Sequence, residues 1–207
     1  EWVGSFKAST TGPYYFCTNS DDASFLWIGA YAKVGYAVGN ALVNNGGGPP
    51  AGPATGVTVA SLEQAVALLL HSAVRLTTLC MPHLERSGRG RIINTASSSV
   101  REPIDNLALS NIVRAGVVGW AKTLSREVGP KGITVNTIAT GKIETDRLRS
   151  LVGSQDALDK LAETIPARRI GRPEELADLV CFLASDRASY ISGTVIPVDG
   201  GLGRGLL

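Results

Sequence analysis

The sequence predicts an α/β fold in which a doubly wound parallel sheet carries helices on both faces. From residue 41 onward, short β-branched runs alternate with long helical patterns, and turn residues separate them. With 207 residues, the chain is long enough for one well-buried domain and too short for two of ordinary size. Its 44% hydrophobic and 18% charged residues are typical of a globular protein.

The predicted elements follow from periodicity and from residues that start and stop helices. The strands are expected at 41–43, 91–96, 133–138 and 194–198. The helices are expected at 61–86, 107–128 and 173–184. Ser61 followed by Gln64 has the form of a capping box, Gly88 ends the first helix, and Pro173 suits the first turn of the last. The second helix is expected to close at Gly129 and Pro130.

Residues 1–40 differ in texture from the rest. They hold nine of the twelve aromatic residues and only five charged ones, and they show neither a helical period nor a strand alternation longer than a few residues. We therefore interpret 1–40 as an atypical N-terminal segment of replaced material. Residues 41–207 are interpreted as a single domain whose first βαβ portion is incomplete or replaced.

Charge, hydropathy and cysteine content exclude several classes of partner. A net charge of +2 without a long basic cluster argues against nucleic-acid binding. No apolar run approaches the roughly 20 residues of a spanning helix, and the start of the chain does not resemble a signal peptide. Three dispersed cysteines, Cys17, Cys80 and Cys181, fit neither a disulfide framework nor a metal site. We expect a cytoplasmic protein with no nucleic-acid, membrane or metal partner.

Polar and glycine-rich segments follow three consecutive predicted strands. They are Asn44-Asn45-Gly46-Gly47, Ser97-Ser98-Ser99 and the loop 140–145. In an open parallel sheet the ligand lies beyond the carboxyl ends of the strands. The repeated pattern therefore predicts a binding edge.

Six ordered segments resemble a known family, the short-chain dehydrogenases/reductases, and most closely the subgroup of 3-oxoacyl-carrier-protein reductases. The segments are Asn44–Gly47, Arg91–Ser97, Gly132–Asn136, Gly141–Thr145, Arg169–Glu175 and Ser192–Gly201. The resemblance covers residues 41–205, and it rests on the order and spacing of the segments more than on any one motif.

The resemblance implies a Rossmann-like fold and hydride transfer between NAD or NADP and a carbonyl/alcohol substrate, with a 3-oxoacyl thioester as one candidate. It implies a homodimer or homotetramer built on the faces of helices 107–128 and 173–184. Ile143 would meet the nicotinamide through its backbone and Thr145 through its hydroxyl. The cofactor-binding positions that carry over are Asn44, Asn45, Gly46, Gly141, Ile143 and Thr145.

The catalytic positions depart from the family pattern. Ser97 matches the serine that binds the substrate oxygen, but Ser110 stands where the family has a tyrosine and Arg114 where it has a lysine. Leu69 replaces an asparagine that relays protons through water. A tyrosine pKa near 10 can be lowered by a neighbouring cation, whereas a serine hydroxyl has no comparable pKa and an arginine keeps its proton.

Two hypotheses therefore remain open. In the first, the chain is an active oxidoreductase with an altered set of Ser97, Ser110 and Arg114, or with Glu102 or Asp105 recruited as the acid. In the second, it is a catalytically degenerate scaffold that binds a nucleotide or a partner. The family's glycine-rich pyrophosphate turn is missing, and the resemblance of Gly35–Gly39 to it is attributed to chance.

Overall fold

The computed structural model describes residues 24–28, 33–34, 36–37 and 41–205. Its main element is a five-stranded sheet with the strand order β1-β4-β5-β6-β7. The four C-terminal strands are parallel to one another, as the sequence predicts. They are β4 (Ala41–Asn45), β5 (Arg91–Ser97), β6 (Thr134–Thr140) and β7 (Val195–Val198).

The first strand corrects two expectations. Strand β1 (Ser24–Ile28) lies within the segment where no strand was identified, and it pairs antiparallel with β4 instead of extending the parallel sheet. Five residues are too few to reveal a period, and the strand forms by backbone pairing along the edge of β4. Two short strands, β2 (Lys33–Val34) and β3 (Tyr36–Ala37), make a separate antiparallel pair. Most of residues 1–40, including Gly35, Val38 and Gly39 of the motif attributed to chance, lie outside the described residues, so the interpretation of this segment stays a prediction.

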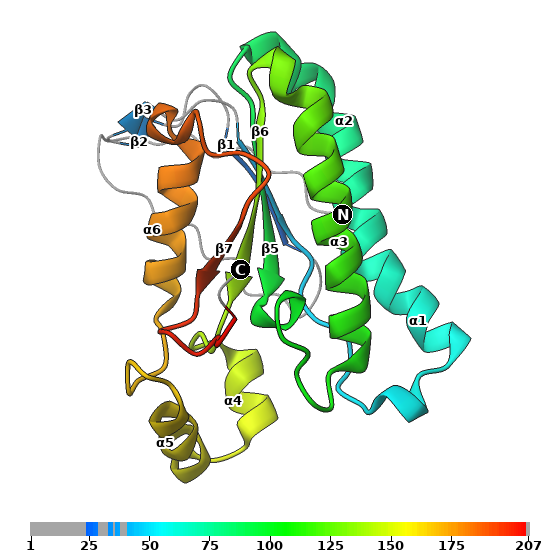
Figure 1. Cartoon of the computed structure of the whole chain (residues 1–207), viewed down its shortest axis with the longest axis vertical. Coiled ribbons are helices and arrows are strands. Elements are labelled where there is room, and N and C mark those ends of the chain that lie inside the picture. Colours follow the sequence, from blue (N-terminus) through cyan, green and yellow to red (C-terminus); the bar gives the residue numbers. More distant parts are fainter. Residues whose placement is uncertain (1–23, 29–32, 35, 38–40, 206–207) are drawn as a thin grey trace.

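Helices cover both faces of the sheet (Figure 1). One face carries α1 (Val59–Val66), a π-helical turn (Ala67–His71), α2 (Ser72–Ser87) and α3 (Ala108–Val128). The other face carries α6 (Pro173–Ala184). Because successive strand residues point to opposite faces, Ile92 packs with Leu84 and Val135, whereas Ile93 packs with Ile138 and Leu183.

The helix boundaries confirm the predicted elements and correct one cap. The residue that caps α1 is Thr58, not Ser61: its side chain accepts a 3.1 Å hydrogen bond from the Ser61 amide, and the Ser61 hydroxyl oxygen accepts one from the Thr58 amide. The first helix therefore begins almost a turn earlier than expected. Gly88 ends α2 with a left-handed φ of 61°. Helix α3 ends at Val128 as predicted, although the left-handed residue is Gly132.

Two short helices lie beyond the carboxyl ends of the strands (Figure 1). They are α4 (Asp146–Val152) and α5 (Gln155–Thr164). Thr145 caps α4 and Ser154 caps α5 through their side-chain oxygens. The remaining 3₁₀ turns are η1 (Ala54–Gly56), η3 (Ser98–Val100), η4 (Gly129–Lys131) and η5 (Asp186–Ala188).

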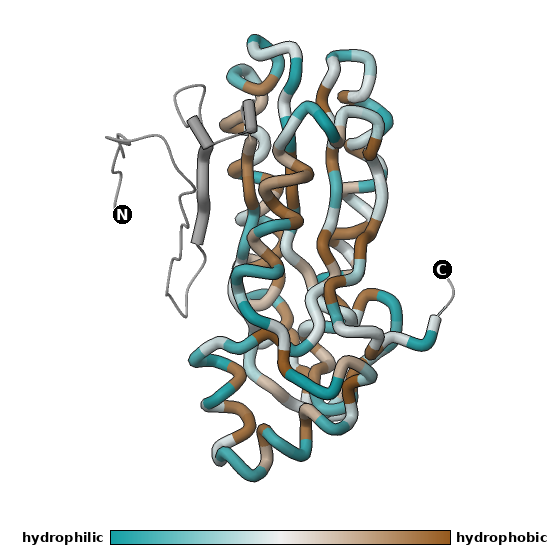
Figure 2. Tube along the Cα trace, turned by 90° about the vertical axis from the view of Figure 1, so that its left-hand side faces the viewer, coloured by the Kyte–Doolittle hydropathy of each residue, from teal (hydrophilic) through white to brown (hydrophobic). Residues whose placement is uncertain are grey.

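The continuous helix from Val59 to Ser87 is the one described helix long and apolar enough to cross a membrane by length and composition alone. In the fold it packs against β4 and α3, and Leu69 and Ala73 of its inner face are buried. Apolar and polar residues alternate along the tube in Figure 2, as expected for helices with one buried side.

Candidate functional site

The strand register brings the predicted ligand-binding segments to one edge of the sheet. Asn44 of β4 is level with Asn94 of β5, and Ser97 at the end of β5 is level with Thr140 of β6. Thr140 is in turn level with Val198 of β7. The loops that follow the four parallel strands therefore leave the sheet on the same side, which is where ligands bind in such folds.

The side chain of Asn44 forms hydrogen bonds inside the protein. Its Nδ2 donates to Asn94 Oδ1 at 2.8 Å and to Thr77 Oγ1 at 3.2 Å, and these bonds tie β4 to β5 and to α2. All three side chains are buried. The carboxamide of Asn44 is thus directed inward, and the binding of a cofactor by Asn44, Asn45 and Gly46 stays a prediction.

The glycines after β4 allow close packing of the chain. A Cβ at Gly46 would lie 3.0 Å from the Leu68 carbonyl oxygen, and Gly47 has a left-handed φ of 66°. Close packing explains the glycine at position 46, and the left-handed backbone explains the glycine at position 47.

The three residues of the altered catalytic set lie around the ends of β5 and α3. Ser97 Oγ accepts a hydrogen bond from the Ser99 amide at 3.2 Å, and its own O–H can donate to another group. Ser110 is buried on the first turn of α3, and its Oγ accepts from Arg114 Nε at 3.0 Å. The i, i+4 spacing that places a tyrosine above a lysine in the family here couples a serine to an arginine.

The guanidinium of Arg114 is held by the surrounding backbone. Its Nη1 donates to the Thr95 carbonyl at 3.2 Å, and its Nη2 donates to the Gly47 carbonyl. Burial, followed by the charge of Arg147, lowers the pKa of Arg114 to about 10. The group therefore stays protonated near neutral pH, where it can stabilise an anion but does not readily release a proton.

Leu69 is a core residue of the π-helical turn. It is buried and packs with Ala65, Leu109 and Val113. It also lines a cavity of about 10 Å³ beside Arg114, next to the Asn44 Oδ1 and Asn94 Nδ2 atoms, which have no hydrogen-bond partner among the described residues. An apolar side chain therefore occupies the position of the family's water-binding asparagine.

The loop after β6 keeps two features expected of a cofactor loop. Its bridge to Gly171 uses the Lys142 carbonyl and the Glu144 amide, so no hydrogen bond in the described part of the chain engages the Ile143 backbone. The Thr145 hydroxyl oxygen accepts from the Leu148 amide and can still donate its proton. Gly141 is required by packing, because a Cβ there would lie 2.5 Å from the Asp199 Cα.

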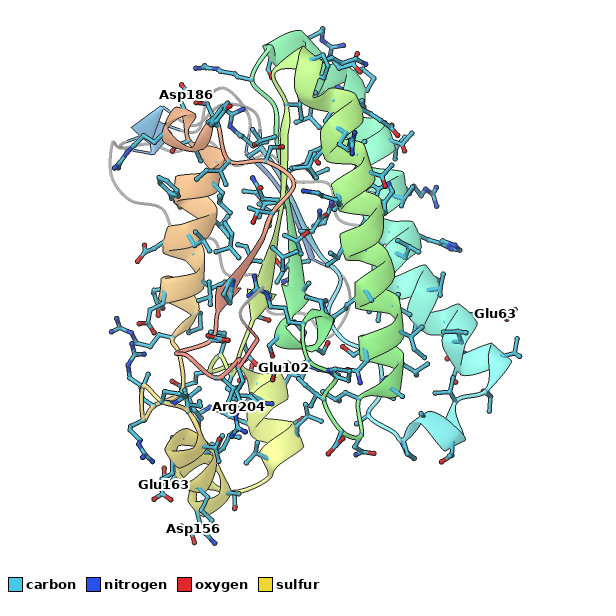
Figure 3. All side chains as sticks on the ribbon, in the orientation of Figure 1. Glu63, Glu102, Asp156, Glu163, Asp186 and Arg204 are labelled. Carbon is cyan, nitrogen blue, oxygen red and sulfur yellow. The ribbon has the colours of Figure 1, made fainter. Side chains whose placement is uncertain are left out.

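Glu102 is engaged elsewhere, which weakens its case as a replacement acid. One of its carboxylate oxygens accepts from the backbone amides of Arg204 and Gly205, both at 2.7 Å. Figure 3 shows Glu102 and Arg204 next to each other at the carboxyl end of the sheet. Glu102 borders a cavity of about 470 Å³ together with Ser98 and Lys142. This volume is large enough for a small molecule.

Arg147 is a site residue that the sequence reasoning missed. It belongs to the first turn of α4, and its Nη2 donates to the Pro49 carbonyl at 2.8 Å, which brings it to the loop that also binds Arg114. The available signal was its position, two residues after Thr145 at a strand mouth. Only the tertiary structure shows that its side chain reaches the loop after β4.

Comparisons with known proteins agree with this geometry. The family model described as enoyl-(acyl carrier protein) reductase matches residues 27–203. The 3-oxoacyl-[acyl-carrier-protein] reductase MabA of Mycobacterium tuberculosis is 39% identical over 149 residues, which cover 72% of this chain and 60% of that protein. Nodulation protein G of Azospirillum brasilense is 31% identical over 204 residues, 97% of this chain and 81% of that protein. The chain thus spans about six tenths of the length of the first reductases it matches.

A solved structure extends the likeness to three dimensions. The NADPH-bound short chain oxidoreductase from Pseudomonas aeruginosa PAO1, described as containing an atypical catalytic center, superimposes with a TM-score of 0.75 at 29% identity. The match covers 82% of this chain and 67% of that one. The ordered segments, the parallel sheet and the matched family model lead to one conclusion: this chain belongs to the short-chain dehydrogenase/reductase family.

Proposed function

We propose that the protein is an NAD(P)-dependent oxidoreductase that transfers a hydride between a nicotinamide cofactor and a carbonyl/alcohol substrate. The observation that carries the proposal is the hydrogen-bonded pair of Ser110 and Arg114 at the carboxyl edge of the sheet, where the family has its catalytic pair. Family membership and the NADPH-bound structural relative support the choice of cofactor. The reductase names of the curated relatives make a 3-oxoacyl thioester the first substrate class to test.

The described residues fit the nicotinamide half of the cofactor. The unengaged Ile143 backbone and the Thr145 hydroxyl are suited to a carboxamide, and in our proposal Asn45 and Gly46 lie on the adenine-ribose side. Gly141 shapes the same loop through its contact with Asp199. No glycine-rich turn leading into a helix N-terminus precedes β4 in the described ranges 24–28, 33–34 and 36–37. When bound, the cofactor supplies or accepts the hydride.

The altered set suits charge stabilisation better than proton transfer. In our proposal the Ser97 hydroxyl donates to the substrate oxygen and stabilises the alkoxide that develops on it, and the positive charge of Arg114 favours the alkoxide without a direct bond to it. Ser110 orients the Arg114 guanidinium through its hydrogen bond. Because neither side chain has a pKa near neutrality, the proton comes from water, and we expect a chemical step slower than one assisted by a tyrosine.

A scaffold without turnover is the second candidate. Leu69 favours it, because this buried side chain gives an apolar surface where the family binds a water molecule. Under this alternative the chain binds a nucleotide or a protein partner and catalyses no hydride transfer.

Titration with NADH and NADPH separates the two candidates. We expect nicotinamide fluorescence to change on binding, and the bound protein to oxidise NADPH or NADH slowly with acetoacetyl thioesters or simple ketones. Binding without turnover supports the scaffold. A purified, folded chain that binds neither dinucleotide contradicts the oxidoreductase proposal.

We also propose how the protein assembles and where it is located in the cell. Exposed Leu79 on α2 and Ile112 on α3 are apolar side chains on outer helix faces, and they support pairing into a homodimer or homotetramer. The two described cysteines, Cys80 and Cys181, are free thiols, which suits the cytoplasm. The proposed partners are small molecules and further copies of this chain.

A further inference from the structure

Two guanidinium groups from different helices meet on one loop. Arg114 of α3 donates to the Gly47 carbonyl, and Arg147 of α4 donates to the Pro49 carbonyl. Arg147 also covers the residue between them, because a Cβ at Gly48 would lie 2.8 Å from its guanidinium carbon. The two cations are therefore held against the same few backbone atoms.

Among the described residues, neither charge is balanced by a carboxylate. The ion pairs among the described residues include neither Arg114 nor Arg147, and both side chains are partly buried. Arg149, on the same helix as Arg147, shows the opposite arrangement, because it is exposed and paired with Glu144. Two like charges in a partly buried place repel each other more strongly than they would in water.

Both groups retain hydrogen-bond donors. A guanidinium has five N–H groups. The bonds to Ser110, Thr95 and Gly47 use three in Arg114, and the bond to Pro49 uses one in Arg147. Paired guanidiniums with unused donors are suited to an oxyanion, which they can bind with several charge-assisted hydrogen bonds.

We propose that Arg114 and Arg147 together form an anion-binding subsite, which selects carbonyl substrates that carry a carboxylate. This assignment rests on the oxidoreductase function proposed above, because it places the anion at the edge where Ser110 and Arg114 lie. A phosphate group, such as one of the dinucleotide's own, has the same recognition chemistry. The experiment therefore includes one ligand for each source.

Calorimetric binding of three probes to the full chain tests the proposal. The probes are acetoacetate, its uncharged methyl ester and inorganic pyrophosphate, each with and without NADPH. The variant Arg147→Met removes one cation, Arg147→Lys retains a charge, and Arg149→Met is the matched control on α4. Thermal melting of each variant establishes that it is folded.

We expect acetoacetate to bind at least about tenfold more tightly than its ester, and Arg147→Met to abolish this preference. Arg147→Lys should retain part of it, and Arg149→Met all of it. Tighter binding of pyrophosphate, also lost in Arg147→Met, would assign the same subsite to a phosphate.

Three results overturn the subsite: equal binding of acid and ester, equal effects of Arg147→Met and Arg149→Met, or no binding of either anion. If the chain binds NADPH in such a case, only the subsite fails and the oxidoreductase proposal stands. If the chain binds acetoacetate through Arg147 but no dinucleotide, the subsite stands and the oxidoreductase proposal fails.

Discussion

Two arginines at opposite ends of β5 show how the fold treats a buried cation. Arg91 begins the strand with 2% of its surface exposed, and it donates to the carbonyls of Gly90, Gly132 and Ser185 as well as to Asp186. Asp186 lies at the end of the molecule opposite Glu102 (Figure 3). The cation at the amino edge is therefore paired with a carboxylate and uses four of its five N–H groups.

Arg114, at the carboxyl edge, has no such pairing. Its bonds go to two backbone carbonyls and a serine, and the charge that acts on its pKa is that of another cation, Arg147. Burial lowers the pKa of both arginines, but Asp186 opposes the shift at Arg91 whereas Arg147 adds to it at Arg114. The difference is expected if Arg91 maintains the fold, and it supports our proposal that Arg114 binds a ligand.

The largest expected effect comes from restoring the family's proton donor. The double change Ser110→Tyr with Arg114→Lys introduces a phenol beside a tunable cation, and we expect it to raise carbonyl reduction about 100-fold. Steady-state oxidation of NADPH measures it. Ser110→Phe with Arg114→Lys is the control, since it adds the ring without the hydroxyl. No gain in a double variant that binds NADPH would mean that the altered set has its own chemistry.

The same substitution at the two arginines tests their contrast directly. Arg91→Met strands buried carbonyls and removes the partner of Asp186, so we expect it to lower the free energy of unfolding by about 2–3 kcal/mol. Arg114→Met also leaves the Thr95 and Gly47 carbonyls without this donor, but it removes a buried cation that has no carboxylate beside it among the described residues, so we expect a smaller loss of about 1 kcal/mol. Urea unfolding of both variants at pH 7 gives the comparison. Equal losses would contradict the division into a structural and a ligand-binding arginine.

The smallest expected effect concerns Glu175, a carboxylate that is bound by Arg169 at the protein surface. Hydrogen bonding to Arg169, and then to the Arg172 amide, lowers the pKa of the partly exposed Glu175 from 4.5 to about 2. Because the folded pKa is depressed, this stabilisation is present above about pH 4.5 and is lost as the pH falls to about 2. Urea midpoints of the wild type and Glu175→Gln should therefore differ at pH 6 and converge near pH 2. A difference independent of pH would be inconsistent with this pair.

Much of the fold follows from local patterns. The 3.6-residue period of α3 and the β-branched run of β6 predict those elements within one or two residues, because each buries a continuous apolar face. Strand β1 was not predicted, because it forms by backbone pairing with the edge of β4 and this pairing leaves no periodic pattern in the sequence. The cap at Thr58 was missed because the serine three residues later has the same chemistry.

The sequence by itself determined the family scaffold and the order of its elements, and its resemblance to the family implies that Ser110 and Arg114 replace the catalytic pair. Helical spacing places these two side chains together, since residues four apart lie on one face. Only the tertiary structure decided that Asn44 is directed into the interior and that Arg147 reaches the loop bound by Arg114. Such contacts join residues 33 to 98 positions apart, and packing between elements decides them.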